Sequence, residues 1–510
     1  MASADTKEMT VKKFNAVVIG SGQSGTPLAS ALAQAGRKTA LIERTHIGGT
    51  CINEGCTPTK TMIASGRVGH LAKRSADYGI WNIPTQSLEK GHKAYHSKEE
   101  GDWEKMNVAV DMMKVRQRKR DIVNSFRGGS EARLSKQEGL ELITGDASFR
   151  DEKSLVVKMS GQEEGVVVAA EKFFINVGET PSRPDLPGLD QVDPKRVLDS
   201  TSIMELGEVP HHLIVLGGSY VGLEFAQLFR RLGSKVTVLQ RGKQLVPRED
   251  PEIAEAVKQI MKEDGIDVHL DVTVANTKPD HGENVARKVV VFFELGQEHR
   301  RNLVNGSHLL LATGRTPNTE SLNLSAAGVE TDSKGYITVD PKLRTTSPAE
   351  IYALGDCHPG PKFTHMSYDD FRILKANHLS DSSSQTQLST TDRQIPYVMY
   401  TDPQLGHIGL HEHEAKAKYG EDKIQTASMP MAWVARALET DESRGMMKAV
   451  VHKETEQILG FTCLGLEGGE LMSIVQTAML GSLKYTALQN AIYAHPTLAE
   501  SLNNLWGYLK

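Results

Sequence analysis

The sequence predicts an α/β fold in which two dinucleotide-binding units are followed by a C-terminal α+β domain. Two glycine-rich loops, at residues 20–25 and 217–222, each follow an apolar strand and precede a helix. Beyond residue 392, strand patterns with turns come before helical ones. The 510 residues suffice for three domains of roughly 150 residues each.

The composition argues against several classes of protein. Hydrophobic residues make up 39% of the chain and charged residues 24%, which are ordinary values and argue against wholesale disorder. Lys and Arg number 59 against 64 Asp and Glu, so the basic excess expected of a nucleic-acid-binding protein is missing. The stretch MASADTKEMTVKKF lacks the apolar core of a secretory signal, and no apolar run approaches the ~20 residues that span a bilayer. We therefore expect a cytoplasmic protein with no nucleic-acid or membrane partner.

The first unit begins with FNAVVI, which has the pattern of a buried parallel strand, and the loop GSGQSG follows at once. Gly20, Gly22 and Gly25 thus form the GxGxxG pattern between a strand and the helical TPLASALAQAG. A second strand, TALIE, ends in Glu43, where an acid can hold the hydroxyl pair of a ribose. Strand, loop, helix and acid together favour dinucleotide binding over a purely structural glycine turn.

The second unit lies within HHLIVLGGSYVGLEFAQLFRRLGSKVTVLQRG. Gly217 and Gly222 hold the first and third glycine positions of the pattern, while Ser219 holds the middle one. The serine Cβ crowds the approach of a pyrophosphate slightly, so the pattern is imperfect but usable.

The end of the next strand favours NADPH over NADH. Gln240 and Arg241 stand where an NAD site normally carries an acid, and Lys243 and Arg248 follow closely. Without a carboxylate to repel it, a 2′-phosphate would pair with these basic side chains. The alternative is a solvated basic loop, and NADH stays possible. Two dinucleotide units in one chain would let a hydride pass between a nicotinamide and a flavin.

Cys51 and Cys56, in GGTCINEGCTPTK, are two of only four cysteines. In a reducing compartment such a close pair is more often catalytic or metal-binding than a structural staple. On a regular helix their Cα atoms would stand roughly 8 to 9 Å apart, whereas a disulfide needs about 4.4 to 6.8 Å. If they are bonded, the segment must therefore depart from an ideal helix, with the freedom supplied by Gly48, Gly49 and Gly55. A strained bond there would be easily reduced, which suits thiol exchange.

A zinc site at this pair has weaker support, because a tetrahedral site needs four ligands and no further cysteine or histidine pair lies nearby. Cys357 and Cys463 stand alone in apolar surroundings and are expected to be small buried hydrophobes. We predict no resident metal.

From Phe14 to the end, the chain resembles the FAD-dependent pyridine nucleotide–disulfide oxidoreductases, a family that includes dihydrolipoamide dehydrogenase, glutathione reductase and mercuric reductase. The loop at residues 20–25 with Glu43 is similar to the family's FAD site, and GGTCINEGCTPTK is similar to its redox disulfide. The resemblance implies that Cys51 meets the substrate and that Cys56 faces the flavin. Lys60 matches the lysine near flavin N5.

Three further segments carry the resemblance into the middle of the chain. In GGSYVGLE, it places Tyr220 as the residue that gates the nicotinamide pocket and Glu224 as the acid that pairs with the lysine. In ATGRTPNTESL, Gly314 belongs to the cofactor-binding pattern, and in YALGDC, Asp356 matches the aspartate on the ribityl and phosphate side of the flavin. In FTHMS, Thr364 is implied to begin a helix beneath the flavin ring.

The segment AHPTLAE, near the C-terminus, resembles the family's His–Glu pair. His495 would be the base that activates the freed thiol, and Glu500 would fix its tautomer. In family members that use dithiols, this pair reaches across a dimer to the partner's disulfide, so the resemblance implies a homodimer. Taken alone, His495 could equally be a helix cap, with Pro496 in the first turn.

The resemblance also implies the domain plan. We expect an FAD-binding domain at residues 12–185 and 310–378, an NAD(P)H-binding domain at 186–309, a Ser/Thr-rich linker at 379–391 and a dimerisation domain at 392–510. Residues 80–108 have the polar, irregular pattern of a surface insertion, to which no function is assigned.

The C-terminal half resembles proteins called mercuric reductase-like, and a soft thiolate pair would suit a soft metal ion. We therefore expect FAD, NADPH and reduction of Hg(II) to Hg(0). Characterised mercuric reductases, however, end in a vicinal cysteine pair and lack the His–Glu pair, whereas this chain ends in NNLWGYLK. A dihydrolipoamide dehydrogenase or another NAD(P)H-dependent disulfide reductase is the alternative. A flavoprotein that only binds partners is a remote third reading.

Overall fold

The computed structural model describes residues 11–81, 108–159, 165–282, 284, 288–296, 299–379, 387–391 and 393–510. Most of the expected insertion at 80–108 and part of the expected linker at 379–391 lie outside these residues. The chain forms two compact units: Met1–Thr59, Arg120–Arg183 and Thr313–Tyr397 make the first, and Lys60–Lys119, Pro184–Ala312 and Val398–Lys510 make the second. This division by compactness does not test the expected domain boundaries, which stay predictions.

A seven-stranded sheet forms the centre of the first unit, in the order β3-β2-β1-β6-β5-β4, with β17 also paired to β6. The pairs β1–β2, β1–β6, β2–β3 and β6–β17 are parallel, while β4–β5 and β5–β6 are antiparallel. A small ribbon pairs two short strands, β7 and β16. The strands are β1 Val11–Ile19, β2 Thr39–Glu43, β3 Leu140–Thr144, β4 Asp146–Asp151, β5 Ser154–Lys158, β6 Val166–Ile175, β7 Glu179–Pro181, β16 Arg315–Pro317 and β17 Glu350–Ala353.

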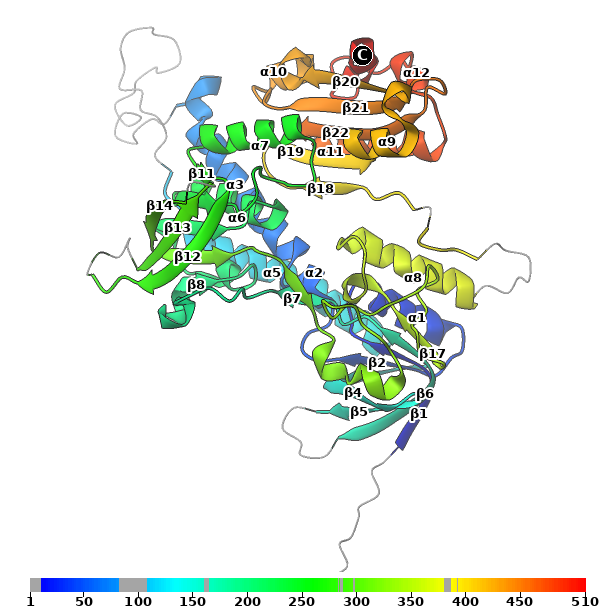
Figure 1. Cartoon of the computed structure of the whole chain (residues 1–510). Helices are drawn as coiled ribbons and strands as arrows, with labels where there is room; N and C mark the ends of the chain where they lie inside the picture. The colour runs from blue at the N-terminus through cyan, green and yellow to red at the C-terminus, as the bar shows by residue number, and fades with distance from the viewer. Residues whose placement is uncertain are drawn as a thin grey trace, which may run out of the picture. The chain divides into compact units, whose positions relative to one another are not determined.

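The expected parallel strand at residues 14–19 lies in the middle of this sheet and is buried on both faces. Ala16 and Val18 pack with residues of α1 and α8, whereas Val17 and Ile19 pack in a second cluster on the other face. A continuous apolar run, without polar alternation, is what a strand covered on both faces requires. Figure 1 shows α1 and α8 beside each other next to β17. The helices that begin in or belong to this unit are α1 Gly25–Gln34, α2 Gly49–Asn53, α3 Cys56–Lys73 and α8 Thr364–Leu379, and α5 Met112–Ser135 ends in it.

The second unit contains a parallel five-stranded sheet in the order β11-β10-β9-β15-β8. An antiparallel sheet, β12-β13-β14, adjoins it through a shared apolar cluster that includes Leu216, Leu239 and Phe293. The elements are β8 Val197–Leu198, β9 His212–Leu216, α6 Tyr220–Leu232, β10 Lys235–Leu239, α7 Pro251–Glu263, β11 Asp267–His269, β12 Val272–Pro279, β13 Val289–Leu295, β14 Arg300–Gly306 and β15 His308–Leu311.

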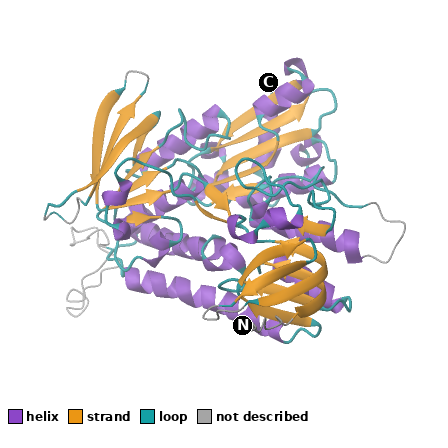
Figure 2. Ribbon diagram, turned by 60° about the horizontal axis from the view of Figure 1, so that its bottom comes forward, coloured by secondary structure: helices purple, strands orange, loops and turns teal. Residues whose placement is uncertain are grey.

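The C-terminal part of the second unit is an antiparallel sheet in the order β18-β19-β22-β21-β20, packed with helices, which confirms the expected α+β pattern. Its core includes Phe461, Val475 and Trp506. Figure 2 shows this mixture of strands and helices by colour. No helix of the described residues is both long and apolar enough to cross a bilayer. The elements are β18 Tyr397–Met399, β19 Gln404–Gly409, α9 Glu412–Tyr419, β20 Ile424–Pro430, α10 Ala435–Glu439, β21 Met446–His452, β22 Ile458–Gly465, α11 Gly468–Leu480, α12 Tyr485–Gln489 and α13 Ser501–Leu505.

Candidate active site

The first glycine loop joins β1 to α1 and tolerates no side chain at its outer positions. Gly20 has a φ of 99°, a conformation that favours glycine. A Cβ on Gly20 would lie 2.2 Å from the carbonyl oxygen of Asn176, and one on Gly25 would lie 2.1 Å from the carbonyl oxygen of Gly20. A Cβ on Gly22 would meet the Asn176 side chain at 2.9 Å. The loop is therefore a tight strand-to-helix turn of the kind that brings backbone N–H groups to a phosphate.

Glu43 ends β2 beside this loop. Its Oε2 accepts hydrogen bonds from the backbone N–H of Ser21 at 2.9 Å and from the Ser21 hydroxyl at 2.5 Å, and its Oε1 accepts the N–H of Thr45 at 2.9 Å. The carboxylate is thus held at the carboxyl edge of the parallel sheet. That edge is where an acid binds ribose hydroxyls in dinucleotide sites.

One cavity of about 330 Å³ brings several of the predicted residues of the first unit together, and its volume is within the range of small-molecule sites. Gly25, Cys56 and Gly314 do not line it. The glycine loop, Glu43 and Cys51 line it, as do Asp356 and Thr364. Because one cavity runs from Glu43, the acid expected to bind a ribose, to Cys51, the residues fit an FAD. Burial raises the pKa of Asp356, while Lys362 and Arg315 oppose that rise.

The cysteine segment has the break that a Cys51–Cys56 bond requires. Helix α2 ends at Asn53, and α3 begins at Cys56. Gly48 and Gly49 enter the segment with φ of 108° and 63°, and a Cβ on Gly49 would lie 2.6 Å from the Cα of Gly22. The segment therefore packs directly on the first glycine loop, which places Cys51 in the wall of the cavity.

Cys56 lies near the start of α8. Its Sγ is 3.4 Å from the Oγ1 of Thr364, the first residue of that helix. Partial positive charge at the N-terminus of a helix stabilises a nearby anion. Thr364 thus has the expected place at a helix start, and its helix favours a thiolate at Cys56.

Lys60 follows Cys56 by one turn of α3 and forms an ion pair with Glu224 of α6, with 2.7 Å between Nζ and Oε2. Glu224 is 5% exposed, so its charge is well shielded from water. The backbone N–H of Tyr400 donates to its other oxygen at 2.8 Å, and the ring centroid of Tyr400 lies 4.9 Å from Lys60 Nζ. The structure therefore brings together the lysine and the acid that the sequence paired, and adds an aromatic ring over the ammonium group.

The second glycine loop, between β9 and α6, is also sterically closed to side chains. Gly217 has a φ of 116°, and a Cβ on Gly222 would lie 2.1 Å from the carbonyl oxygen of Gly217. Gln240, at the position of the missing acid, accepts the N–H of Gly218 on its Oε1 at 2.9 Å. The glutamine thus supports the loop as an acid would, without a charge.

The basic side chains near this loop are exposed, whereas the acid that binds Tyr220 is buried. The basic residues Arg241, Lys243 and Arg248 are all exposed, as a site for a charged 2′-phosphate requires. Tyr220, the expected gate, begins α6 and donates its hydroxyl to Oε1 of Glu249 at 2.9 Å. Glu249 is 3% exposed.

His495 and Glu500 lie together in the C-terminal part of the chain. Nδ1 of His495 is 2.9 Å from Oε2 and 3.1 Å from Oε1 of Glu500. Because the carboxylate accepts a hydrogen bond from the Nδ1–H group, Nε2 keeps a lone pair and can act as a base. The His495 side chain is 68% exposed, so that nitrogen is accessible.

The other two cysteines are buried, as expected. Cys357 and Cys463 both have zero exposure, and burial raises the pKa of each thiol to about 12. Neither thiol can form a thiolate at neutral pH.

Sequence reasoning missed three residues that structure these sites. Asn176 supports the first glycine loop, Glu249 holds Tyr220, and Tyr400 covers Lys60. Asn176 directly follows an apolar strand, so its position at the carboxyl edge of the sheet was a usable signal. The other two reach the site from distant parts of the chain and left no local pattern.

A glycine loop that shares a cavity with Cys51, in a chain with a second such loop, is the arrangement expected of flavoprotein disulfide oxidoreductases. Residues 14–370 match the family model of the pyridine nucleotide-disulphide oxidoreductases, and residues 395–505 match the dimerisation domain of that family. The chain belongs to this family. Membership implies FAD and a nicotinamide nucleotide as cofactors, and the dimerisation domain suggests a homodimer.

Relatives within the family cover nearly the whole chain. A probable pyridine nucleotide-disulfide oxidoreductase, RclA of Escherichia coli, is 34% identical over 98% of this chain and 100% of its own length. A mercuric reductase of Bacillus cereus is 33% identical over 96% of this chain and 70% of its own. A dihydrolipoyl dehydrogenase of Bacillus subtilis is 30% identical over 95% and 96%. The solved structure of RclA, an HOCl-induced flavoprotein disulfide reductase, superposes with a TM-score of 0.81 at 33% identity, covering 97% of this chain and 100% of that one.

Proposed function

We propose that this protein is an NADPH-dependent flavoenzyme that passes electrons through flavin and a Cys51–Cys56 redox disulfide to a soft metal ion, with Hg(II) as the first candidate. The placement of Cys51 in the same cavity as Glu43 and Asp356 carries this proposal. The mercuric reductases among the relatives support it, as does the RclA structure described as a Cu(II) complex. Thiolates are the ligands that soft metal ions prefer.

The cysteine chemistry follows from what the side chains can do. Bound FAD would supply the exchange of two electrons between a nicotinamide and the disulfide. Two electrons break the sulfur–sulfur bond, after which Cys56 is a thiolate near the start of α8 and Cys51 is free to bind the acceptor. Both thiolates would then bind Hg(II), and a second pair of electrons from the nicotinamide, supplied through bound FAD, would reduce it to Hg(0) and leave the two thiolates. Lys60, four residues after Cys56 in α3 and paired with Glu224, would be the source of positive charge for the thiolate.

A second candidate acceptor is a disulfide such as lipoamide. The observation that favours it is the His495–Glu500 pair, with 2.9 Å between Nδ1 and Oε2. Exchange with a disulfide acceptor needs a base that takes the proton of the attacking cysteine thiol and returns a proton to the leaving thiolate, whereas a metal ion binds thiolates directly. We infer that His495 serves the partner subunit's disulfide in a homodimer, and that this function is used only with disulfide substrates.

The preference for NADPH is the third part of the proposal. Gln240 supports the glycine loop without a negative charge, and Arg241, Lys243 and Arg248 are exposed nearby. A dianionic 2′-phosphate is therefore favoured over a free ribose hydroxyl.

The test is NADPH consumption by the FAD-loaded enzyme with Hg(II), Cu(II), lipoamide and glutathione disulfide in turn. We expect turnover with a metal ion that Cys51→Ser abolishes and His495→Ala leaves within about threefold, since a loss of base catalysis alone would cost roughly 100-fold. His299→Ala, at an exposed histidine of the second unit, is the matched control. If only lipoamide supports turnover and His495→Ala abolishes it, the electron acceptor is a disulfide and not a metal ion. No turnover with any acceptor would contradict the proposal.

A further inference from the structure

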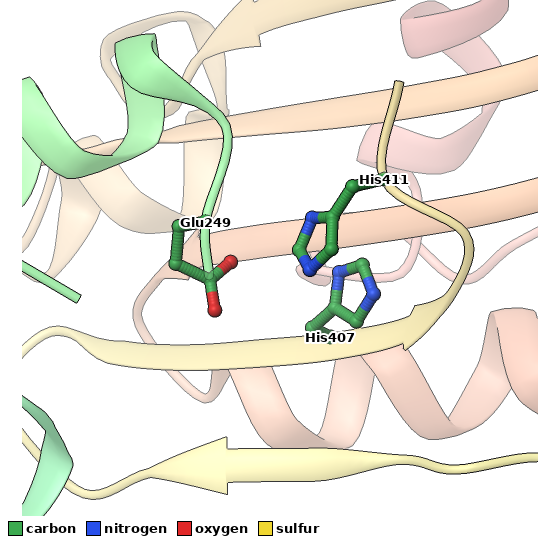
Figure 3. Close-up of side chains that lie close together, drawn as sticks. All are labelled: Glu249, His407 and His411. Carbon is green, nitrogen blue, oxygen red and sulfur yellow. The ribbon is translucent and has the colours of Figure 1, made fainter. Parts of the chain in front are cut away.

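Three side chains with metal-binding atoms meet in the second unit. Their ligand atoms, one each from Glu249, His407 and His411, all lie within 4.8 Å of one another. Figure 3 shows the carboxylate of Glu249 facing the two imidazole rings. All three residues are buried, at 3%, 2% and 6% exposure. Two imidazoles with one carboxylate form a ligand set that is typical of zinc and cupric ions.

Each of these residues is placed by a different element. Glu249 precedes α7, and its backbone N–H donates to the carbonyl of Val246 at 2.9 Å. His407 lies within β19, directly opposite Thr462 of β22. His411 is the N-cap residue of α9, where its backbone N–H donates to the Glu414 carboxylate at 2.9 Å. Strand pairing and helix capping thus hold the backbone of both histidines.

Burial keeps both imidazoles in the form that a metal ion needs. Burial lowers the pKa of His407 to about 3, and His411 lowers it further. Burial also lowers the pKa of His411, although Asp250 and Glu414 act in the opposite direction. Neutral imidazoles carry lone pairs at neutral pH, so an ion would not have to displace protons from them.

The hydrogen bonds of His407 assign its ligand atom. Its Nε2 lies 3.1 Å from the carbonyl oxygen of Gly409, which can only accept, so Nε2 carries the proton. Nδ1 therefore has the lone pair and accepts from the Thr462 hydroxyl at 2.7 Å. In metal sites a histidine commonly donates its second ring N–H to a backbone carbonyl, which fixes the tautomer. An ion can take the place of this hydroxyl on Nδ1 only after the Thr462 side chain turns about its Cα–Cβ bond, because the oxygen atom itself faces the lone pair.

A second adjustment, at His411, is required before an ion can bind. The rings of His407 and His411 are stacked, with 3.9 Å between centroids and 14° between planes. Imidazole lone pairs lie in the ring plane, so two stacked rings cannot both point at one ion. A turn of the His411 ring about its Cβ–Cγ bond corrects this, and that torsion is broad in histidine.

A second cluster of possible ligands, close to the first in the sequence, already binds a lysine side chain. Asp250, Glu252 and Glu412 also converge, but the ammonium group of Lys448 lies among them, 2.9 Å from Asp250 and 2.6 Å from Glu412. Lys448 already neutralises that acidic cluster, so it carries no comparable inference.

We propose that Glu249, His407 and His411 bind one divalent transition-metal ion, with water as a fourth ligand, and that this ion controls Tyr220. The link is Glu249, whose Oε1 accepts the Tyr220 hydroxyl at 2.9 Å. A cation bound to the Glu249 carboxylate reduces the negative charge on the oxygen that accepts the Tyr220 hydroxyl. That hydrogen bond should then weaken, because hydrogen bonds to charged groups are the stronger ones. The metal site stands on its own geometry, while its effect on nucleotide binding rests on the gating function proposed for Tyr220.

The binding test uses Zn²⁺ and the full-length, FAD-loaded Cys51→Ser/Cys56→Ser protein, because the thiols would also bind the ion. Calorimetry should show one equivalent of Zn²⁺. His411→Asn should weaken it by roughly tenfold or more, as expected when a ligand is lost, while keeping a residue that caps α9 well. Glu249→Gln should also weaken Zn²⁺ binding by roughly tenfold or more. This second variant keeps the proposal testable if His411→Asn fails to fold.

The matched control is His413→Asn, two residues away on a side chain that is 69% exposed. Equal weakening by His413→Asn, or no Zn²⁺ binding at all, would overturn the site. Binding of Mg²⁺ as tightly as Zn²⁺ would also overturn it, because that result would indicate an all-oxygen cluster.

The link to Tyr220 is tested by titrating NADPH into the same double-serine protein with and without Zn²⁺. Zn²⁺ should change the apparent dissociation constant by roughly threefold or more, and Tyr220→Phe should remove this change. An equal change in Tyr220→Phe would refute the link. Normal Zn²⁺ binding without any NADPH binding would instead contradict the proposed nucleotide function and leave the metal site intact.

Discussion

The substitution Gln240→Glu should reverse the nucleotide preference with little effect on the fold. Gln240 Oε1 accepts the Gly218 N–H at 2.9 Å, and a glutamate can keep that bond. Only the weaker bond from Nε2 to the Gln244 carbonyl, at 3.3 Å, is lost. The variant therefore adds a negative charge at the position of an NAD-type acid and leaves the loop supported.

The magnitude follows from the exposure of the site. Gln240 is half-buried and its basic neighbours are exposed, so a water-like dielectric applies. A unit charge about 5 Å from a 2′-phosphate of nearly two charges then costs roughly 1.5 kcal/mol, or about tenfold in kcat/KM for NADPH. A hydrogen bond from a ribose hydroxyl to the new carboxylate should favour NADH by a similar factor. The ratio of the two kcat/KM values should thus shift by about two orders of magnitude.

The assay is steady-state kinetics with both nucleotides at low ionic strength, repeated at high salt, where screening should reduce the NADPH penalty. Gln191→Glu, at an exposed glutamine of the same unit, controls for the change in net charge. A nucleotide ratio that stays within about threefold, in a protein of unchanged melting temperature, would refute the electrostatic argument, because the expected change is far larger.

Three further results are expected. Asp402→Asn should cost roughly 3 kcal/mol in the free energy of unfolding at pH 7, since Asp402 pairs with Arg231 at 2.6 Å and with Arg67. Burial opposes its charge, yet these arginines hold the pKa of Asp402 below its ordinary value. This stability is present above about pH 4 and is lost as the pH falls through the lower folded pKa, so urea unfolding curves of wild type and variant should converge in acid. Glu500→Gln should lower turnover with lipoamide by roughly 100-fold with unchanged flavin content, because the tautomer of His495 is no longer fixed; unchanged turnover would exclude a base at this pair. A thiol reagent should label only the cysteines of GGTCINEGCTPTK in the native reduced protein and all four after denaturation; native labelling of Cys51→Ser/Cys56→Ser would contradict the burial of the others.

The parts of the fold that the sequence predicted are those whose signals are local. A continuous apolar strand, a glycine loop and a helix lie within some twenty residues, and the steric demands on Gly20 and Gly25 are set by atoms of the same turn and its neighbouring strand. A break between Cys51 and Cys56 was expected on the condition that they form a disulfide, because a disulfide cannot bridge five residues of a regular helix, and the structure has this break between α2 and α3.

The contacts that sequence reasoning missed join residues from distant segments. Glu249 follows β10. His407 lies in β19, and His411 follows that strand. Each histidine, read singly, has the pattern of a buried strand or a helix cap, and neither pattern predicts a metal ligand. Only the pairing of β19 with β22 and the capping of α9 bring the two rings together. Long-range convergence of this kind leaves no spacing that a single sequence can reveal.

Buried polar residues of helix α6 indicate where contacts between distant segments must form. Glu224, Gln227 and Arg231 are buried at 5%, 3% and 7% exposure and lie along one face of the helix. Glu224 accepts the N–H of Tyr400, Gln227 exchanges two hydrogen bonds with the backbone of Asp402, and Arg231 pairs with its carboxylate. Buried polar groups need such partners, because leaving one unsatisfied is costly. The polar face of α6 therefore fixes residues 400–402, and through them the aromatic ring over Lys60. The acid that was expected only to pair with Lys60 also positions the segment that covers it.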